Sequence, residues 1–155
     1  MNSGTRIVTI CSRAIFQLLL LLAVFGPSGI ALAGVPDVIL QGVVQGQDIE
    51  TYKEIPFFVP SGVSRMTLEF DYSGKAERTT LDIGLRDPQR FRGWSGGARS
   101  RLVIEEALAT PSYLPGPLPS GTWKLIIGVP NIRKAARADY TARIWFDRPD
   151  DHASV

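Results

Sequence analysis

The stretch Tyr140-Thr141-Ala142-Arg143-Ile144-Trp145-Phe146 decides the fold class, because apolar side chains occupy every second position from Tyr140 to Phe146. A repeat of two places alternate side chains on opposite faces of an extended chain, and so predicts a half-buried β-strand. The same alternation recurs over residues 63–72, 81–86 and 123–129. The sequence therefore predicts four strands and no long helix.

Weaker strand patterns occupy residues 38–45, 50–59 and 101–106, each rich in β-formers but interrupted. Pro56 removes a ladder donor from the second of these, which favours an edge strand or a bulged one. Turn-forming Gly, Pro, Asn and Asp residues separate the segments at the spacing of an antiparallel sandwich. We therefore expect an all-β, antiparallel β-sandwich of seven or eight strands, with at most one helical turn at residues 132–138.

The first 33 residues read as a secretory signal peptide. Arg6 and Arg13 precede an apolar run of about 12 residues, and Ala31-Leu32-Ala33 supplies small residues for cleavage after Ala33. The run is short for the ~20 residues of a bilayer span. We therefore expect a chain exported to the periplasm or beyond, with a sandwich at 34–147, a polar tail at 148–155 and no stable membrane span after cleavage.

Charge and cysteine content narrow the classes of partner. Without Arg6 and Arg13, the 122 residues from Gly34 onward carry 15 basic and 15 acidic side chains. A neutral domain lacks the basic surface that nucleic acids or anionic membranes require, so neither partner is expected. Cys11 is the only cysteine and precedes the cleavage point, so stability must come from the core rather than from disulfides.

Catalytic patterns are sparse, and we expect a domain that is not itself an enzyme. Gly93-Trp94-Ser95-Gly96-Gly97 matches the spacing G-x-S-x-G of a serine nucleophile, but that motif needs a following helix, an acid and a histidine. The only histidine, His152, lies in the tail. Zinc and iron–sulfur ligands are missing, no cofactor is indicated, and Asp82 and Asp87 are only weak calcium candidates. A small serine hydrolase using Ser95 remains a minor alternative.

A glycine-rich stretch at residues 90–99 offers the best candidate binding surface. It sets Trp94 among arginines, Arg92 included, in a segment that the glycines suggest is a loop, and Tyr113 lies in the proline-rich stretch 111–121. Trp, Tyr and Arg concentrate binding energy at interfaces, and loops on rigid sandwiches often bind. We therefore select Arg92, Trp94 and Tyr113 as candidate contacts to a ligand or partner, although Trp94 could equally cap the core.

Four segments carry a family resemblance that spans nearly all of the chain after residue 33. They are Tyr52–Arg65, Arg78–Pro88, Phe91–Gly97 and Pro115–Trp123. Together they resemble the β-sandwich that precedes the catalytic domain of exported PHP-type metallohydrolases of the CehA/McbA group. More distantly, the order of motifs is similar to the jelly-roll-like pre-peptidase C-terminal domains of secreted hydrolases.

This resemblance implies a jelly-roll-like accessory or binding domain associated with a PHP-type metal-dependent hydrolase, as a truncated, split or stand-alone relative. In that group the PHP domain supplies the histidine and aspartate metal ligands, which have no counterpart in this chain, so no catalytic role transfers to its residues. The alternative function, drawn from the residues alone, is a free-standing module that binds carbohydrate or another surface ligand.

Overall fold

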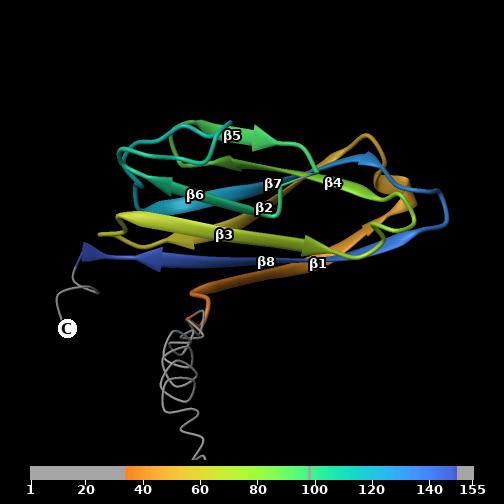
Figure 1. The fold of residues 1–155 in the computed structure, drawn as a ribbon, viewed down its shortest axis with the longest axis horizontal. Coiled ribbons are helices and arrows are strands. Elements are labelled where there is room, and N and C mark those ends of the chain that lie inside the picture. The colour runs from red at the N-terminus through yellow and green to blue at the C-terminus, as the bar shows by residue number, and fades with distance from the viewer. Residues whose placement is uncertain (1–33, 98, 150–155) are drawn as a thin grey trace, which may run out of the picture. The chain divides into compact units, whose positions relative to one another are not determined.

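The computed structural model describes residues 34–97 and 99–149, and these form a β-sandwich of two antiparallel four-stranded sheets (Figure 1). The expected signal peptide, and the tail residues 150–155 with His152, lie outside the described residues. A short 3-10 turn, η1 (Gly46–Asp48), accompanies the strands, which are β1 (Val38–Gln45), β2 (Tyr52–Val59), β3 (Arg65–Tyr72), β4 (Thr80–Arg86), β5 (Phe91–Ser95), β6 (Arg101–Glu105), β7 (Gly121–Asn131) and β8 (Arg137–Asp147).

The strand order is that of a jelly roll. One sheet runs β1-β8-β3-β6 and the other β2-β7-β4-β5. The antiparallel pairs β1–β8, β2–β7, β3–β6 and β4–β5 are nested, as if one long hairpin had been rolled up, and only β4 and β5 are consecutive neighbours in a sheet. The expected jelly-roll-like sandwich is confirmed.

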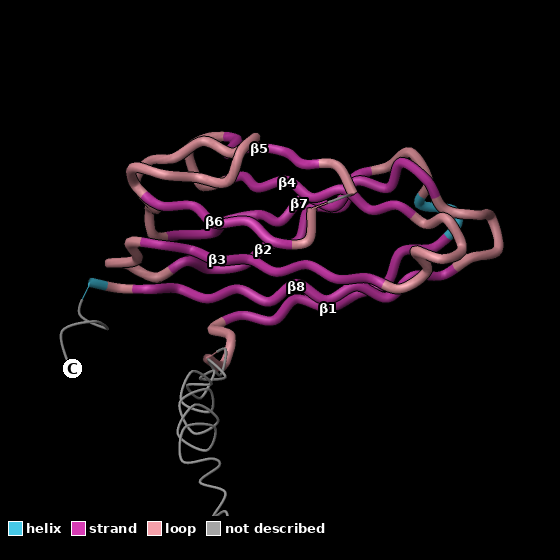
Figure 2. Tube along the Cα trace, in the orientation of Figure 1, coloured by secondary structure: helices cyan, strands magenta, loops and turns pink. Residues whose placement is uncertain are grey.

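The expected strands are present, and the eighth is β5, in a stretch where the glycines of the sequence predict a loop. β2, which carries Pro56, lies at a sheet edge as predicted. Residues 132–136 form no helix between β7 and β8: Ala136 N–H donates to Arg133 O at 2.8 Å, so the segment is a single turn. Strands and loops are distinguished in Figure 2.

The core lies between the two sheets and is built from the alternating apolar positions. Met66, Leu68, Trp123, Leu125 and Ile144 are all fully buried. Each such side chain contributes about 1.5–3 kcal/mol relative to an exposed position. Within the part of the chain that the structure describes, no helix has the length and apolar character needed to cross a membrane.

The outer face of the β2-β7-β4-β5 sheet carries a second, smaller apolar layer. Leu125 and Ile127 face the core, so Ile126 between them faces outward, yet it is only 7% exposed. In register it lies between Glu54 of β2 and Gly84 of β4, and Gly84 in turn pairs with Trp94 of β5. A side chain on this outer face must therefore shield Ile126 from solvent. The candidate site lies on the same face.

Candidate functional site

The three residues predicted as ligand contacts have different environments. Arg92 is fully buried, Tyr113 is 6% exposed, and only Trp94 keeps appreciable exposed surface. Arg92 and Trp94 lie in strand β5 rather than in a loop. The structure thus gives Arg92 and Tyr113 interior positions, and leaves Trp94 as the one of the three that a ligand could reach.

All five N–H donors of Arg92 are used inside the protein. Nε and Nη2 both donate to Leu114 O, Nη2 also to Gly116 O, and Nη1 to Pro117 O and to Asp87 Oδ2, at 3.0–3.1 Å. The guanidinium also lies 5.2 Å from the ring centroid of Trp123. Prolines remove amide donors from the 111–120 loop but leave its carbonyls in need of partners, and Arg92 provides them.

Asp87 balances the buried charge of Arg92. Its carboxylate accepts from Arg92 and from the backbone amides of Gln89 and Arg90 at 2.7 and 2.6 Å. Burial raises the pKa of Asp87, but the hydrogen bonds from these two amides and from Arg92 outweigh it and leave the pKa below its usual value. Both oxygens are thus occupied, so Asp87 does not join Asp82 in the calcium site considered from sequence.

Tyr113 and Ser95 hold the proline-rich loop against the edge of the sheet. Tyr113 Oη donates to Ile83 O at 2.9 Å and lies 2.9 Å from Ser95 Oγ. Burial raises the pKa of the Tyr113 phenol. Ser95 is 7% exposed and ends strand β5, with a turn rather than a helix after it. The geometry of a nucleophile elbow is therefore not formed around Ser95.

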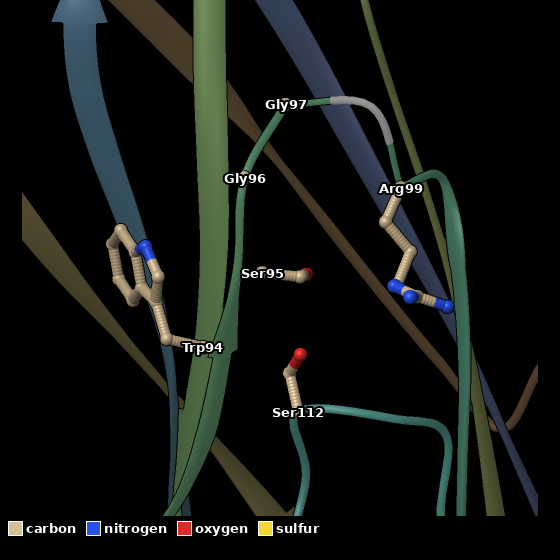
Figure 3. A pocket seen from close by; sticks show the side chains of 6 residues that line it. All are labelled: Trp94, Ser95, Gly96, Gly97, Arg99 and Ser112. Atoms are coloured by element: carbon tan, nitrogen blue, oxygen red, sulfur yellow. The ribbon is translucent and has the colours of Figure 1, made fainter.

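A pocket of about 520 Å³ opens beside β5, lined by Ser95, Gly96, Gly97, Arg99, Ser112 and part of Trp94. Figure 3 shows the Trp94 indole leaving β5 on one side, while Ser95, Ser112 and Arg99 point into the space on the other. This pocket brings together the Arg99 guanidinium and the Ser112 hydroxyl, and this pair of donors suits a small anion. It contains no base that could activate a hydroxyl.

The Trp94 indole lies over two glycines on the outer face of the sheet. A Cβ added to Gly84 would stand 2.4 Å from Trp94 Cε3, and one added to Gly128 would stand 2.7 Å from Trp94 Cη2. The six-membered part of the indole therefore spans β4 and β7 at contact distance from the backbone. Glycine in a strand interior often marks such a close approach. Gly84 pairs with Ile126, and Gly128 is two residues from Ile126 on the same face of β7, so an indole over both glycines accounts for the low exposure of Ile126.

Tyr52 stands beside the indole. The ring centroids of Tyr52 and Trp94 are 5.6 Å apart with an angle of 68° between the planes. Tyr52 is 71% exposed and pairs in register with Gly128, which pairs on its other side with Asp82. The two rings thus meet as the floor and wall of a corner, which we call the aromatic corner.

A second pocket, of about 350 Å³, opens at the aromatic corner. Its lining residues are Glu50, Thr51, Tyr52, Asp82, Trp94, Gly128, Val129 and Pro130. The lining combines two carboxylates and a threonine with two aromatic rings and the aliphatic Val129 and Pro130, and the volume falls in the usual range of small-molecule sites. Burial raises the pKa of Asp82, against a hydrogen bond from the Gly97 amide that lowers it.

In the described part of the chain, no group of three or more His, Cys, Asp or Glu side chains is placed to hold a metal ion. The sequence reading missed Tyr52 and the two glycines. The available signal was the outward position of Gly84 and Gly128 in strands, where a glycine weakens the strand unless another group approaches closely.

No protein-family model matches the chain, and no curated protein shows significant sequence similarity to it.

Proposed function

We propose that this protein is a non-catalytic binding module that recognises a saccharide through the aromatic corner. The observation that carries the proposal is the Trp94 indole held flat over Gly84 and Gly128, with Tyr52 at 68° beside it. A ring fixed in this way costs little entropy to order when a ligand stacks on it. The apolar C–H face of a pyranose ring suits such a surface.

The polar groups of the pocket support the same ligand class. Asp82 and Glu50 line it, and their carboxylates can accept hydrogen bonds from sugar hydroxyls. The pocket therefore combines aromatic rings, on which a sugar ring can stack, with carboxylates that can orient its hydroxyls. The nearest aromatic residues farther along the same face, Phe58 and Phe91, are exposed but lie outside it.

A titration of oligosaccharides against the protein tests this proposal. After a glycan array selects a ligand, calorimetry should show binding by the wild type and at least a tenfold loss, about 1.4 kcal/mol, in Trp94→Ala and in Tyr52→Ala. Phe58→Ala is the matched control, because Phe58 is 60% exposed on the same strand and face as Tyr52 but outside the pocket. Retention of no glycan, or unchanged affinity in Trp94→Ala, would overturn the proposal.

We further propose that the module is exported and acts beside a PHP-type metallohydrolase. The support is the sequence resemblance carried by Tyr52–Arg65 and the three later segments, together with the signal-like residues 1–33. An immunoblot of fractionated host cells tests both parts. A periplasmic or extracellular species that co-purifies with, or is continuous with, a metal-dependent hydrolase is expected, whereas a cytoplasmic species without hydrolase would contradict it.

A further inference from the structure

The pocket at the aromatic corner contains negative charge without a cation to balance it. Within residues 34–97 and 99–149, no Lys or Arg lies at salt-bridge distance from Asp82 or Glu50, and the pocket lining includes no basic side chain. By contrast, Glu54 on the same face is paired with Lys124. The two carboxylates of the pocket thus lack the cationic partner that Glu54 has.

Asp82 is the more constrained of the two carboxylates. It is half-buried, and its one protein donor is the backbone amide of Gly97. Desolvating a carboxylate without a cationic partner is unfavourable, and burial accordingly raises the pKa of Asp82. A positively charged ligand group would relieve this cost.

Glu50 is held beside the pocket in an uncommon backbone conformation. Its φ is 58°, in the left-handed region that residues other than glycine adopt at a cost of about 1–2 kcal/mol. Glu50 N–H donates to Val129 O at 2.8 Å, and Val129 N–H donates to Thr51 O at 3.1 Å. These bonds to β7 maintain the conformation, and strain of this kind gathers at ligand sites.

The rings favour the same charge as the carboxylates. The face of an aromatic ring is the negative part of its quadrupole, so Trp and Tyr attract a cation that lies over them, with Trp the stronger. Two rings at 68° present such surfaces from two directions. Calcium fits less well, because it needs six to eight oxygen ligands.

We propose that the pocket formed by Tyr52, Trp94, Asp82 and Glu50 binds the protonated amine of an amino sugar. This inference rests on the proposed saccharide binding and adds the ligand class. The sugar ring stacks at the aromatic corner, and its ammonium group lies between the indole and the two carboxylates. An acetylated amine is neutral, so it loses the attraction to the carboxylates, and it is bulkier, so it fits the pocket less well.

A matched pair of ligands tests the inference. The β-1,4-linked tetramer of glucosamine and its fully N-acetylated counterpart share a backbone and differ in amine charge. In mildly acidic buffer of low salt, calorimetry on the full chain should show at least tenfold tighter binding of the glucosamine tetramer. Because salt screens charge attraction, this preference should shrink as salt is added.

Asp82→Asn should abolish the preference while retaining the fold, because the Asn side-chain oxygen can still accept from the Gly97 amide. Glu50→Gln should reduce the preference in the same direction. Asp71→Asn is the control: Asp71 lies in the other sheet and pairs with Lys75, so its replacement should leave the preference unchanged.

Several results would overturn the inference. Equal or tighter binding of the acetylated tetramer, or an unchanged preference in Asp82→Asn, would refute the amine while leaving saccharide binding intact. Displacement of the glucosamine tetramer by trilysine at a lower concentration would assign the pocket to a basic peptide instead. If neither tetramer binds while other glycans do, amino-sugar binding is refuted and saccharide binding stands. If no glycan binds, the proposed saccharide-binding function is refuted as well.

Discussion

Arg92 supplies hydrogen-bond donors to a loop that is distant in the sequence. The 111–120 loop is rich in proline, so it has more carbonyl acceptors than amide donors. The fully buried guanidinium of Arg92 donates to these carbonyls, because it offers five donors in one plane. Asp87 then neutralises the charge. A buried ion pair of this kind is costly to break, since the remaining partner stays buried and uncompensated.

Replacement of Arg92 should therefore destabilise the protein severely. We expect Arg92→Met to lower the free energy of unfolding by about 3–5 kcal/mol, because Asp87 and three loop carbonyls lose their partner. Urea denaturation measures the change. Arg101→Met is the control, since Arg101 is 60% exposed and its pair with Glu69 should contribute less than about 1 kcal/mol. Equal losses of unfolding free energy in the two variants would show that the buried Arg92 network stabilises the protein no more than an exposed ion pair does.

Glycine at position 84 should matter through the indole above it. A methyl group there would stand 2.4 Å from Trp94, so Gly84→Ala should displace the ring and reduce saccharide affinity about tenfold, or about 1.4 kcal/mol. Gly42→Ala is the matched control, because its Cβ would meet the Tyr140 ring at similar distance in the other sheet. Similar affinity losses in both variants would point to general destabilisation rather than to the site.

Sequence reasoning selected Trp94 together with Arg92 and Tyr113, but it could not predict the buried environment of the last two. Arg92 and Tyr113 have the residue types of binding surfaces, and no pattern in a single sequence reveals that the 111–120 loop folds back over β5 to enclose them. Tyr52 begins β2 and its partnership with Trp94 depends on the register β2–β7–β4–β5, which is set by contacts between residues far apart in the chain.

At the scale of elements, β5 and the 111–120 loop behave as one unit. Leu114 N–H donates to Arg92 O at 2.6 Å, and Gly93 forms a bridge with Tyr113, so the loop partly covers this edge of the sheet. Gly93 has a φ of 147°, and its missing Cβ leaves room for the Ser112 carbonyl. Covering an edge in this way limits pairing with other chains.

Tyr113→Phe should loosen this unit without removing it. The phenol hydroxyl joins the loop to Ile83 O and Ser95, so its loss leaves Ile83 O with the longer bond from Ser95 Oγ, at 3.5 Å, and should cost about 1–3 kcal/mol. Hydrogen exchange should then show faster exchange at Leu114 and Trp94 than in the wild type. Unchanged exchange at both amides would mean that Arg92 alone fixes the loop.

The alternating strands were predictable, whereas β5 was not. Residues 65–72, 80–86, 121–131 and 137–147 bury every second side chain against one core, so their chemistry shows the period of two. In β5 the register shifts opposite Leu85 and Arg86, and Arg92 and Gly93 are both buried in succession. A bulge breaks the alternation, and with it the signal.

For the whole molecule, the jelly roll is held by its core and its hydrogen bonds, since the described chain contains no cysteine. Two carboxylates on or next to β4 then have opposite effects on stability. Asp87 has a lowered pKa in the folded state and Asp82 a raised one. A group with a lowered pKa stabilises the fold when ionised, and one with a raised pKa opposes it.

The pH dependence of unfolding should separate these two effects. Asp87→Asn should lower stability at neutral pH by about 1–3 kcal/mol, because the hydrogen bonds to a charged acceptor are weakened. The difference from wild type should shrink as pH falls below the ordinary aspartate pKa of about 3.9.

Asp82→Asn should have the opposite effect and raise stability at neutral pH, since the folded protein no longer keeps an unpaired carboxylate half-buried. Its advantage should also vanish in acid, where the wild-type Asp82 is protonated. Denaturant midpoints measured across pH test both variants. A neutral-pH loss of stability in Asp82→Asn would show that the Gly97 hydrogen bond outweighs desolvation, and that the pocket does not keep this charge at the expense of stability.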